Sequence, residues 1–171
     1  EGALSDSVRE TVRARIPWLV VNLATAGLAA FVISFFEGTI EAVVALAILM
    51  PIVASMGGNA GTQSLTVAVR ALATRDLTSA NAWRVVRREA AVGLLNGLLL
   101  SLLLGGVTAL AFGPAIGGVI AAALVVNLLV ASLAGTFVPL LLERLGVDPA
   151  LASGTFVTTV TDVVGFFAFL G

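Results

Sequence analysis

Long apolar stretches dominate the chain, and short polar segments separate them. The apolar stretches are residues 16–36, 42–69, 90–112, 115–142 and 150–170. Each provides at least the roughly 20 residues that a helix needs to cross the hydrocarbon core of a bilayer. None alternates every second residue as the strands of a membrane β-barrel do. The pattern therefore predicts an all-α integral membrane protein with five transmembrane helices and its two ends on opposite sides.

The composition agrees with lipid as the solvent of this chain. Hydrophobic residues make up 59% of the 171 residues and charged residues 11%, whereas soluble domains carry about 25% charged residues. There is no cysteine and no histidine, which excludes disulfides, thiolate metal sites and the commonest general base. We expect no enzymatic activity, because an intramembrane aspartyl protease needs two embedded carboxylates and only Asp162 lies inside a predicted span.

Arginine marks one side of the membrane. The nine arginines lie in the N-terminal segment and in the second and fourth connections, and none lies in the first or third connection. The positive-inside rule makes their side cytoplasmic. It places the N-terminus in the cytoplasm and the C-terminus outside, in a cell (inner or plasma) membrane. The arginines, with Trp18 and Trp83 beside them, are expected at the interface, where they contact anionic lipid heads.

Breaker residues predict the connections between the helices. Residues 37–41 and the pair Gly113-Pro114 are expected to form tight turns. Ser79 or Asn81 is expected to cap the third helix. Glu37 and Glu41, at the first outer turn, are candidates for concentrating cations at an outer mouth, with solvated loop ends as the alternative.

Asp162 is the most informative residue of the chain. It is a lone carboxylate within the otherwise uncharged stretch 150–170. A charge near the middle of a span costs about 3 kcal/mol on insertion scales, and chains keep it where it faces a cavity, a partner or an ion. Asp162 is therefore predicted to belong to a site that handles a cation.

The second apolar stretch contains a polar, glycine-rich segment at residues 51–64. Pro51 removes a backbone hydrogen bond, so the helix is expected to be interrupted here. The glycines are Gly57, Gly58 and Gly61, and the polar residues are Asn59, Thr62, Gln63 and Ser64. A broken, polar helix at membrane depth is tolerated where it is buried in protein or lines a watery cavity. We expect it to line a path, with close helix packing as the alternative; packing is the expectation for Gly93 and Gly97.

Asn59 and Asp162 are predicted to lie at similar depth. Asn59 precedes Arg70, near the inner end of its helix, by eleven residues, or roughly 16 Å. Asp162 follows the start of its stretch at residue 150 by twelve residues, or roughly 18 Å. Both positions are near the middle of the membrane.

Two long motifs resemble those of a known family. The segment PIVASMGGNAGTQS, followed by RALATRDL, resembles the second-helix signature of the MgtE-type magnesium channels. The segment GVDPALASGTFVTTVTDVVG resembles the motif around that family's fifth helix, and FEGTIEAV fits its first outer turn. The resemblance covers essentially the whole chain, with both motifs in the family's order and spacing.

The resemblance implies a homodimer of five-helix subunits with a pore along the dimer axis, lined by the second and fifth helices. The family's ion-binding aspartate corresponds to Asp162, its nearby backbone-carbonyl position to Thr158 and its pore-lining asparagine to Asn59. The other positions expected to line the pore are Gly57, Gly58, Gly61, Gln63, Gly154, Thr159 and Gly165. Two positions depart from the pattern, since Thr155 stands where many members carry proline and Gly154 where some carry asparagine.

The implied function is a Mg²⁺ channel that passes hydrated ions into the cytoplasm, with Mn²⁺ or Ca²⁺ as further ions for the same site. A secondary transporter or exchanger of Mn²⁺, Co²⁺ or Ca²⁺ is the alternative, and a structural membrane subunit is a remote one. Family members carry cytoplasmic acidic and CBS domains before the membrane part. Residues 1–15 are expected to be the end of the connecting plug-type helix, and 16–171 the pore domain. The expected partners are a second copy and membrane lipid, and no nucleic acid.

Overall fold

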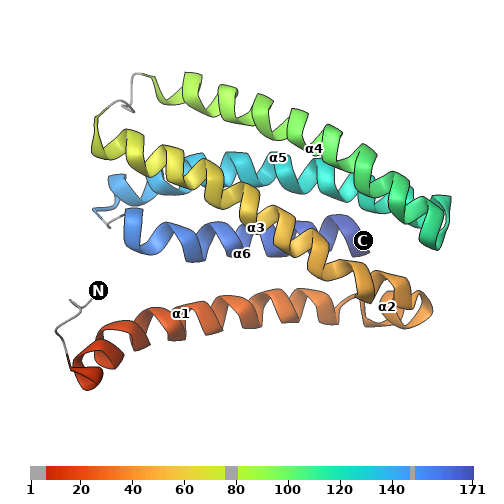
Figure 1. Ribbon diagram of the computed structural model, residues 1–171. Coiled ribbons are helices and arrows are strands. Elements are labelled where there is room, and N and C mark those ends of the chain that lie inside the picture. Colours follow the sequence, from red (N-terminus) through yellow and green to blue (C-terminus); the bar gives the residue numbers. More distant parts are fainter. Residues whose placement is uncertain (1–6, 76–80, 147–148) are drawn as a thin grey trace.

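The computed structural model describes residues 7–75, 81–146 and 149–171, with the backbone alone for 149–152. It is a helical bundle (Figure 1). The helices are α1 (Val8–Ser34), α2 (Glu37–Ala42), α3 (Val44–Ala73), α4 (Ala82–Phe112), α5 (Pro114–Arg144) and α6 (Pro149–Leu170). In the described part of the chain, five of them are long and apolar enough to cross a membrane, and only α2 is not. This confirms the predicted all-α membrane class with five spans.

Helix α5 is the centre of the bundle. It packs against α3, α4 and α6, and α3 also packs against α6. Helix α1 packs mainly against α6 and stands at one side of the bundle (Figure 1). The C-terminal ends of α3 and α5 and the N-terminal ends of α4 and α6 lie at one end, whereas α2 and the α4–α5 turn lie at the other (Figure 1). The arginine-bearing segments therefore gather at one end of the bundle.

Local sequence explains most helix ends. Ser7 and Glu10 form a capping box at the start of α1, with the Ser7 hydroxyl accepting from the Glu10 amide at 3.3 Å and the Glu10 carboxylate accepting from the Ser7 amide at 3.0 Å. Gly113 adopts a φ of +103° and Pro114 occupies the first turn of α5. Left-handed backbone of this kind favours glycine, so the tight turn predicted at Gly113-Pro114 is confirmed.

Two predicted connections differ from the structure. The segment expected to be a tight turn at residues 37–41 forms the short helix α2 (Glu37–Ala42). Asn81 occupies the N-cap position of α4, but its side chain does not cap the first turn. The other predicted cap, Ser79, lies outside the described residues. A helix of this length depends more on tertiary packing than on its cap.

The predicted interruption of the second spanning helix is wrong. Helix α3 continues through Pro51 and all its glycines from Val44 to Ala73. Two contacts explain why. Gly61 lies against Val157 of α6, and the side-chain amide of Asn127 on α5 donates to the carbonyl of Val53 at 3.1 Å. Packing of the glycine face against two neighbouring helices thus offsets the low helix propensity of glycine.

Small residues allow close helix contacts. Gly93 of α4 lies against Ser132 of α5, and Gly97 lies against Val125. A Cβ atom on Gly135 of α5 would lie only 2.7 Å from the backbone oxygen of Gly61 on α3. Such close backbone approach is typical of membrane helix pairs. The predicted packing role of Gly93 and Gly97 is therefore confirmed.

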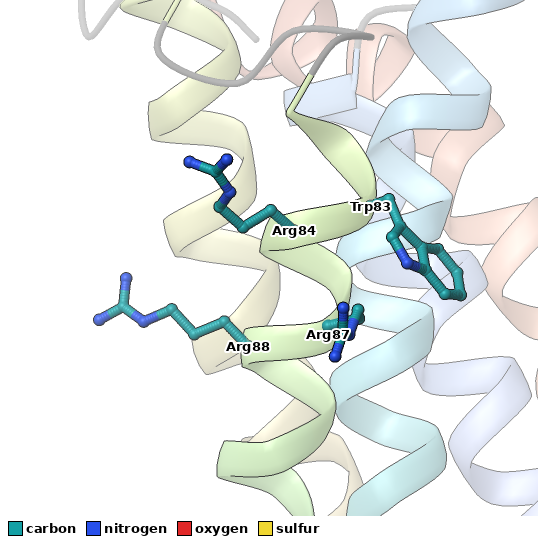
Figure 2. A pocket seen from close by; sticks show the side chains of 4 residues that line it. All are labelled: Trp83, Arg84, Arg87 and Arg88. Atoms are coloured by element: carbon teal, nitrogen blue, oxygen red, sulfur yellow. The ribbon is translucent and has the colours of Figure 1, made fainter.

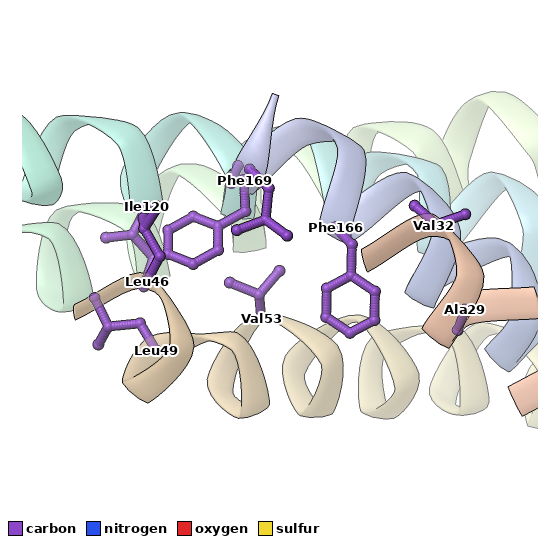
Figure 3. Close-up of a cluster of buried hydrophobic side chains, with 10 residues drawn as sticks. Ala29, Val32, Leu46, Leu49, Val53, Ile120, Phe166 and Phe169 are labelled. Carbon is purple, nitrogen blue, oxygen red and sulfur yellow. The ribbon is translucent and has the colours of Figure 1, made fainter. Parts of the chain in front are cut away.

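A hydrophobic cluster joins four helices of the bundle (Figure 3). It includes Val32 of α1, Val53 of α3, Ile120 of α5 and Phe169 of α6. Val53 and Ile120 are fully buried. The cluster holds the N-terminal half of α3 and the C-terminal half of α6 against each other and against α5.

Candidate functional site

Helix α6 has two different faces. The face toward the bundle carries small and apolar residues at every fourth position: Ser153, Val157, Thr161, Gly165 and Phe169, all buried. The other face carries Gly154 and Thr158, which are exposed, and Thr155, Thr159 and Asp162, which are partly buried. Asp162 follows Thr158 by one helical turn, so the two residues are neighbours on the same face.

Helix α3 is divided in the same way. From Gly57 on, its buried face consists of Gly57, Gly61, Ser64 and Ala68. Its exposed polar face consists of Ser55, Asn59, Thr62, Gln63 and Thr66. Asn59 lies near the middle of the helix, with fifteen residues before it and fourteen after it. The exposed polar face therefore reaches the depth of the membrane centre.

Two contacts define how α3 and α6 align. A Cβ atom on Gly61 would lie 2.6 Å from Val157, and one on Gly165 would lie 3.2 Å from Val53. From Val53 to Gly61 the α3 chain runs forward by eight residues, while the facing α6 residues run backward by eight, from Gly165 to Val157. The two helices are therefore antiparallel, and their register is the same at both contacts. This register places Asn59 level with residue 159, about 4.5 Å along the axis from the level of Asp162. The structure thus brings the two residues to one depth on adjacent helices.

Three of the glycines expected to line the pore lie instead at contacts between helices of the subunit. Gly57 lies against the Asn127 side chain, Gly61 against Val157, and Gly165 against Asn127 and Val53. All three are buried within the subunit, because the missing side chains are what allows α3, α5 and α6 to approach closely. Gly154 remains exposed and Gly58 partly so, with open space where a side chain would stand. Of the expected polar lining, Asn59, Gln63 and Thr158 are exposed.

The carbonyl of Thr158, the expected second ion ligand, is already engaged. It accepts a hydrogen bond from the Thr161 hydroxyl at 3.0 Å, and in an α-helix the amide four residues later, that of Asp162, also donates to it. A carbonyl oxygen has two lone pairs, so neither is left for direct metal coordination. The hydroxyl of Thr159 donates within its helix as well, to the Thr155 carbonyl at 2.7 Å.

Asp162 does not belong to a cluster of metal-ligating side chains in the described part of the subunit. In residues 7–75, 81–146 and 149–171 no three acidic, histidine or cysteine side chains come together as a metal site. The acidic pair Glu37 and Glu41 is exposed on α2, at the end of the bundle opposite the arginine-bearing connections (Figure 1). One subunit therefore offers an embedded carboxylate, exposed amides and hydroxyls.

Two polar residues behind this face were not singled out from the sequence. Asn127 is fully buried between α3 and α6, and its side-chain oxygen has no partner among the described residues. Glu89 of α4 accepts a hydrogen bond from Ser64 of α3 at 3.0 Å. Glu89 directly precedes the third apolar stretch. A carboxylate at the edge of a span was the feature of the sequence from which its role could have been predicted. Ser64 consequently belongs to the α3–α4 contact and not to the exposed face.

These features define a multi-pass helical membrane protein with an embedded carboxylate on a polar face. Residues 50–171 match the model of the MgtE family, described as a divalent cation transporter, and the chain belongs to this family. The resemblance identified from the two sequence motifs is thereby confirmed.

Three relatives are magnesium transporters MgtE. Identity is 44% over 157 residues with that of Thermus thermophilus, 37% over 158 residues with that of Bacillus subtilis and 36% over 161 residues with that of Enterococcus faecalis. The alignments cover 92%, 92% and 94% of this chain and 35%, 35% and 36% of the relatives. The chain thus spans about a third of the length of these relatives.

The contact between Gly57 and Asn127 can be tested with a double-mutant cycle. Gly57→Ala is expected to destabilise the protein by about 1–3 kcal/mol, because its Cβ would overlap the buried Asn127 side chain. In an Asn127→Ala background the same change should cost about 1 kcal/mol less. Unfolding in mixed detergent measures both values. Gly58→Ala, which meets open space, is the matched control; equal costs for Gly57→Ala in both backgrounds would refute the contact.

Proposed function

We propose that two copies of this chain form a pore for hydrated Mg²⁺, with the polar faces of α3 and α6 lining it and Asp162 as its ion-binding residue. One observation carries this proposal: polar side chains of α3 and α6 that are exposed or only partly buried on the single subunit, at the depth where lipid would otherwise meet them. Polar groups at that depth are stable where they contact protein or water, and unstable where they contact hydrocarbon. A second copy facing the first would cover this surface and enclose water.

Charge supports two copies. A single subunit supplies one embedded carboxylate at this face, whereas a twofold axis beside α6 would bring two Asp162 side chains to one ion. Two carboxylates balance the charge of a divalent cation. The interface would be isologous, with the same residues of both subunits in contact, as in most homodimers.

The ion is proposed to keep its inner water shell at Asp162. Mg²⁺ demands octahedral oxygen ligands and loses water reluctantly. The Thr158 carbonyl is occupied by the Thr161 hydroxyl, so the groups facing the ion are the carboxylate and the exposed amide and hydroxyl side chains. These accept from or donate to bound water without replacing it. Asn59 and Thr158 would hold the hydrated ion, together with Asp162.

The proposed direction is inward through a channel. The arginine-bearing end of the bundle is assigned to the cytoplasm by the positive-inside rule, which places Glu37 and Glu41 at the outer mouth. A divalent ion that moves inward gains about 4.6 kcal/mol per 100 mV, twice the value for a single charge. The membrane potential alone would then drive uptake, so the pore needs no energy-coupling domain.

Replacement of Asp162 is the direct test of the site. Asp162→Asn and Asp162→Ala should reduce Mg²⁺ flux into dye-loaded liposomes at least about 100-fold, because a neutral site no longer compensates two positive charges. Glu143→Gln, an exposed carboxylate change at the end of α5, should leave flux unchanged. Wild-type flux in both Asp162 variants, with normal insertion and helix content, would eliminate the proposed site. Unitary current steps in planar bilayers would identify a channel, and flux without such steps a carrier.

The proposed dimer face can be tested separately by cross-linking. The chain has no cysteine, so Thr158→Cys introduces one thiol on the exposed face of α6. We expect an intermolecular disulfide on mild oxidation in proteoliposomes, because a pore axis beside α6 brings two such thiols together. Leu110→Cys, on the 92% exposed side chain of α4, should stay monomeric. Equal cross-linking of the two variants would contradict the proposed axis, even if Asp162 proved essential for flux.

A further inference from the structure

A basic pocket lies at the beginning of α4. It is an open pocket of about 480 Å³ lined by Trp83, Arg84, Arg87 and Arg88 (Figure 2). Figure 2 shows Arg84 and Arg88 extending to one side of the helix, Trp83 to the other side, and Arg87 between them. Three arginines within two helical turns thus line one open pocket.

The charge of this pocket is not compensated by the described part of the chain. Among these residues none of the three guanidinium groups forms an ion pair. The adjacent carboxylate, Glu89, accepts from Ser64 on the α3 side of the helix. The first turn of α4 also presents the positive end of the helix dipole. The pocket is therefore suited to an anion with several oxygen acceptors, which guanidinium groups bind in a bidentate manner.

The position of the pocket favours a lipid over a soluble phosphate. The apolar stretch of α4 begins two residues after Arg88, and Trp83 is 68% exposed, as expected for an indole at the membrane interface. Below the pocket, leucines on the helix surface that continues from Arg84 and Arg88 are exposed. They are Leu95 at 60%, Leu99 at 65% and Leu102 at 76%.

We propose that this pocket binds the phosphate headgroup of an anionic phospholipid, with Arg84, Arg87 and Arg88 on the phosphate oxygens, Trp83 at the glycerol level and the acyl chains along the leucines of α4. The proposal is independent of the ion pathway, because the pocket and the polar face lie on different helices. A bound anionic lipid would hold the start of α4 at the boundary of the bilayer.

Tryptophan fluorescence provides the test. The chain has two tryptophans, so Trp18→Phe leaves Trp83 as the only reporter. Proteoliposomes of phosphatidylcholine receive small amounts of brominated phosphatidylglycerol or brominated phosphatidylcholine, and quenching of Trp83 reports the lipid beside it. We expect quenching by the anionic lipid at a mole fraction at least roughly 10-fold lower than by the neutral lipid, since each surface arginine contributes about a fivefold factor and two of the three already exceed tenfold.

Matched variants distinguish lipid binding in the pocket from attraction of anionic lipid by general surface charge. The triple change R84Q/R87Q/R88Q should abolish the preference for the anionic lipid. The control R9Q/R13Q/R15Q removes three exposed arginines of α1 at the same end of the bundle, and should keep the preference. The charge-preserving set R84K/R87K/R88K should lower it only partly, because lysine does not form the bidentate contact. It also keeps the test informative if the glutamine variant fails to fold.

Three results would overturn the proposal. The first is equal quenching by the two brominated lipids in the Trp18→Phe protein. The second is an equal loss of preference in the two triple-glutamine variants, which would assign the effect to diffuse surface charge. The third is displacement of the brominated phosphatidylglycerol by millimolar glycerol phosphate, which would identify a soluble phosphate as the ligand.

Discussion

The structure depends on one constraint: in hydrocarbon, each polar group must find a partner within protein or water. Several polar side chains of the described helices meet this constraint inside the subunit. The Ser64 hydroxyl donates to Glu89, the Asn127 amide donates to the Val53 carbonyl, and the Thr62 hydroxyl donates back to the Gly58 carbonyl of its own helix. The side chains that remain exposed at the same depth, such as Asn59 and Gln63, lie together on one face. This concentration is the reason for proposing that the face lines a pore.

Small residues and polar residues perform opposite tasks on α3. The glycines allow α5 and α6 to approach one face so closely that a Cβ atom on Gly61 would meet Val157. The polar side chains occupy the other face and are kept away from these contacts. A rigid, continuous helix therefore presents Asn59 at a fixed height relative to Asp162. A broken helix would have offered backbone carbonyls instead, so the continuity of α3 determines that side chains are the available polar groups.

Hydrophobic length was enough to predict the helical class, the number of spans and the grouping of the arginines. Packing at Gly93 and Gly97 was predicted from their spacing and is seen in the structure. The cation-binding role of Asp162 rests on the cost of a charge in a span and stays a prediction. Composition alone could not predict which glycines pack, because Gly57 and Gly58 are adjacent in sequence and differ only in the face of the helix that they occupy. The continuity of α3 and the Ser64–Glu89 contact were also missed, since both depend on neighbouring helices that are distant in sequence.

In the proposed pore, the internal hydrogen bonds of α6 favour an ion that keeps its water. A dehydrated Mg²⁺ would need six oxygen ligands at about 2.1 Å, and the nearby carbonyl of Thr158 is already satisfied by the Thr161 hydroxyl. That hydroxyl is fully buried, so releasing the carbonyl would strand a polar group in the core, which costs about 1–3 kcal/mol. A hydrated ion requires no such rearrangement, because its water ligands reach the carboxylates and amides of a helix that keeps its hydrogen bonds. The same packing that holds α6 rigid thus favours long-range charge compensation over direct coordination.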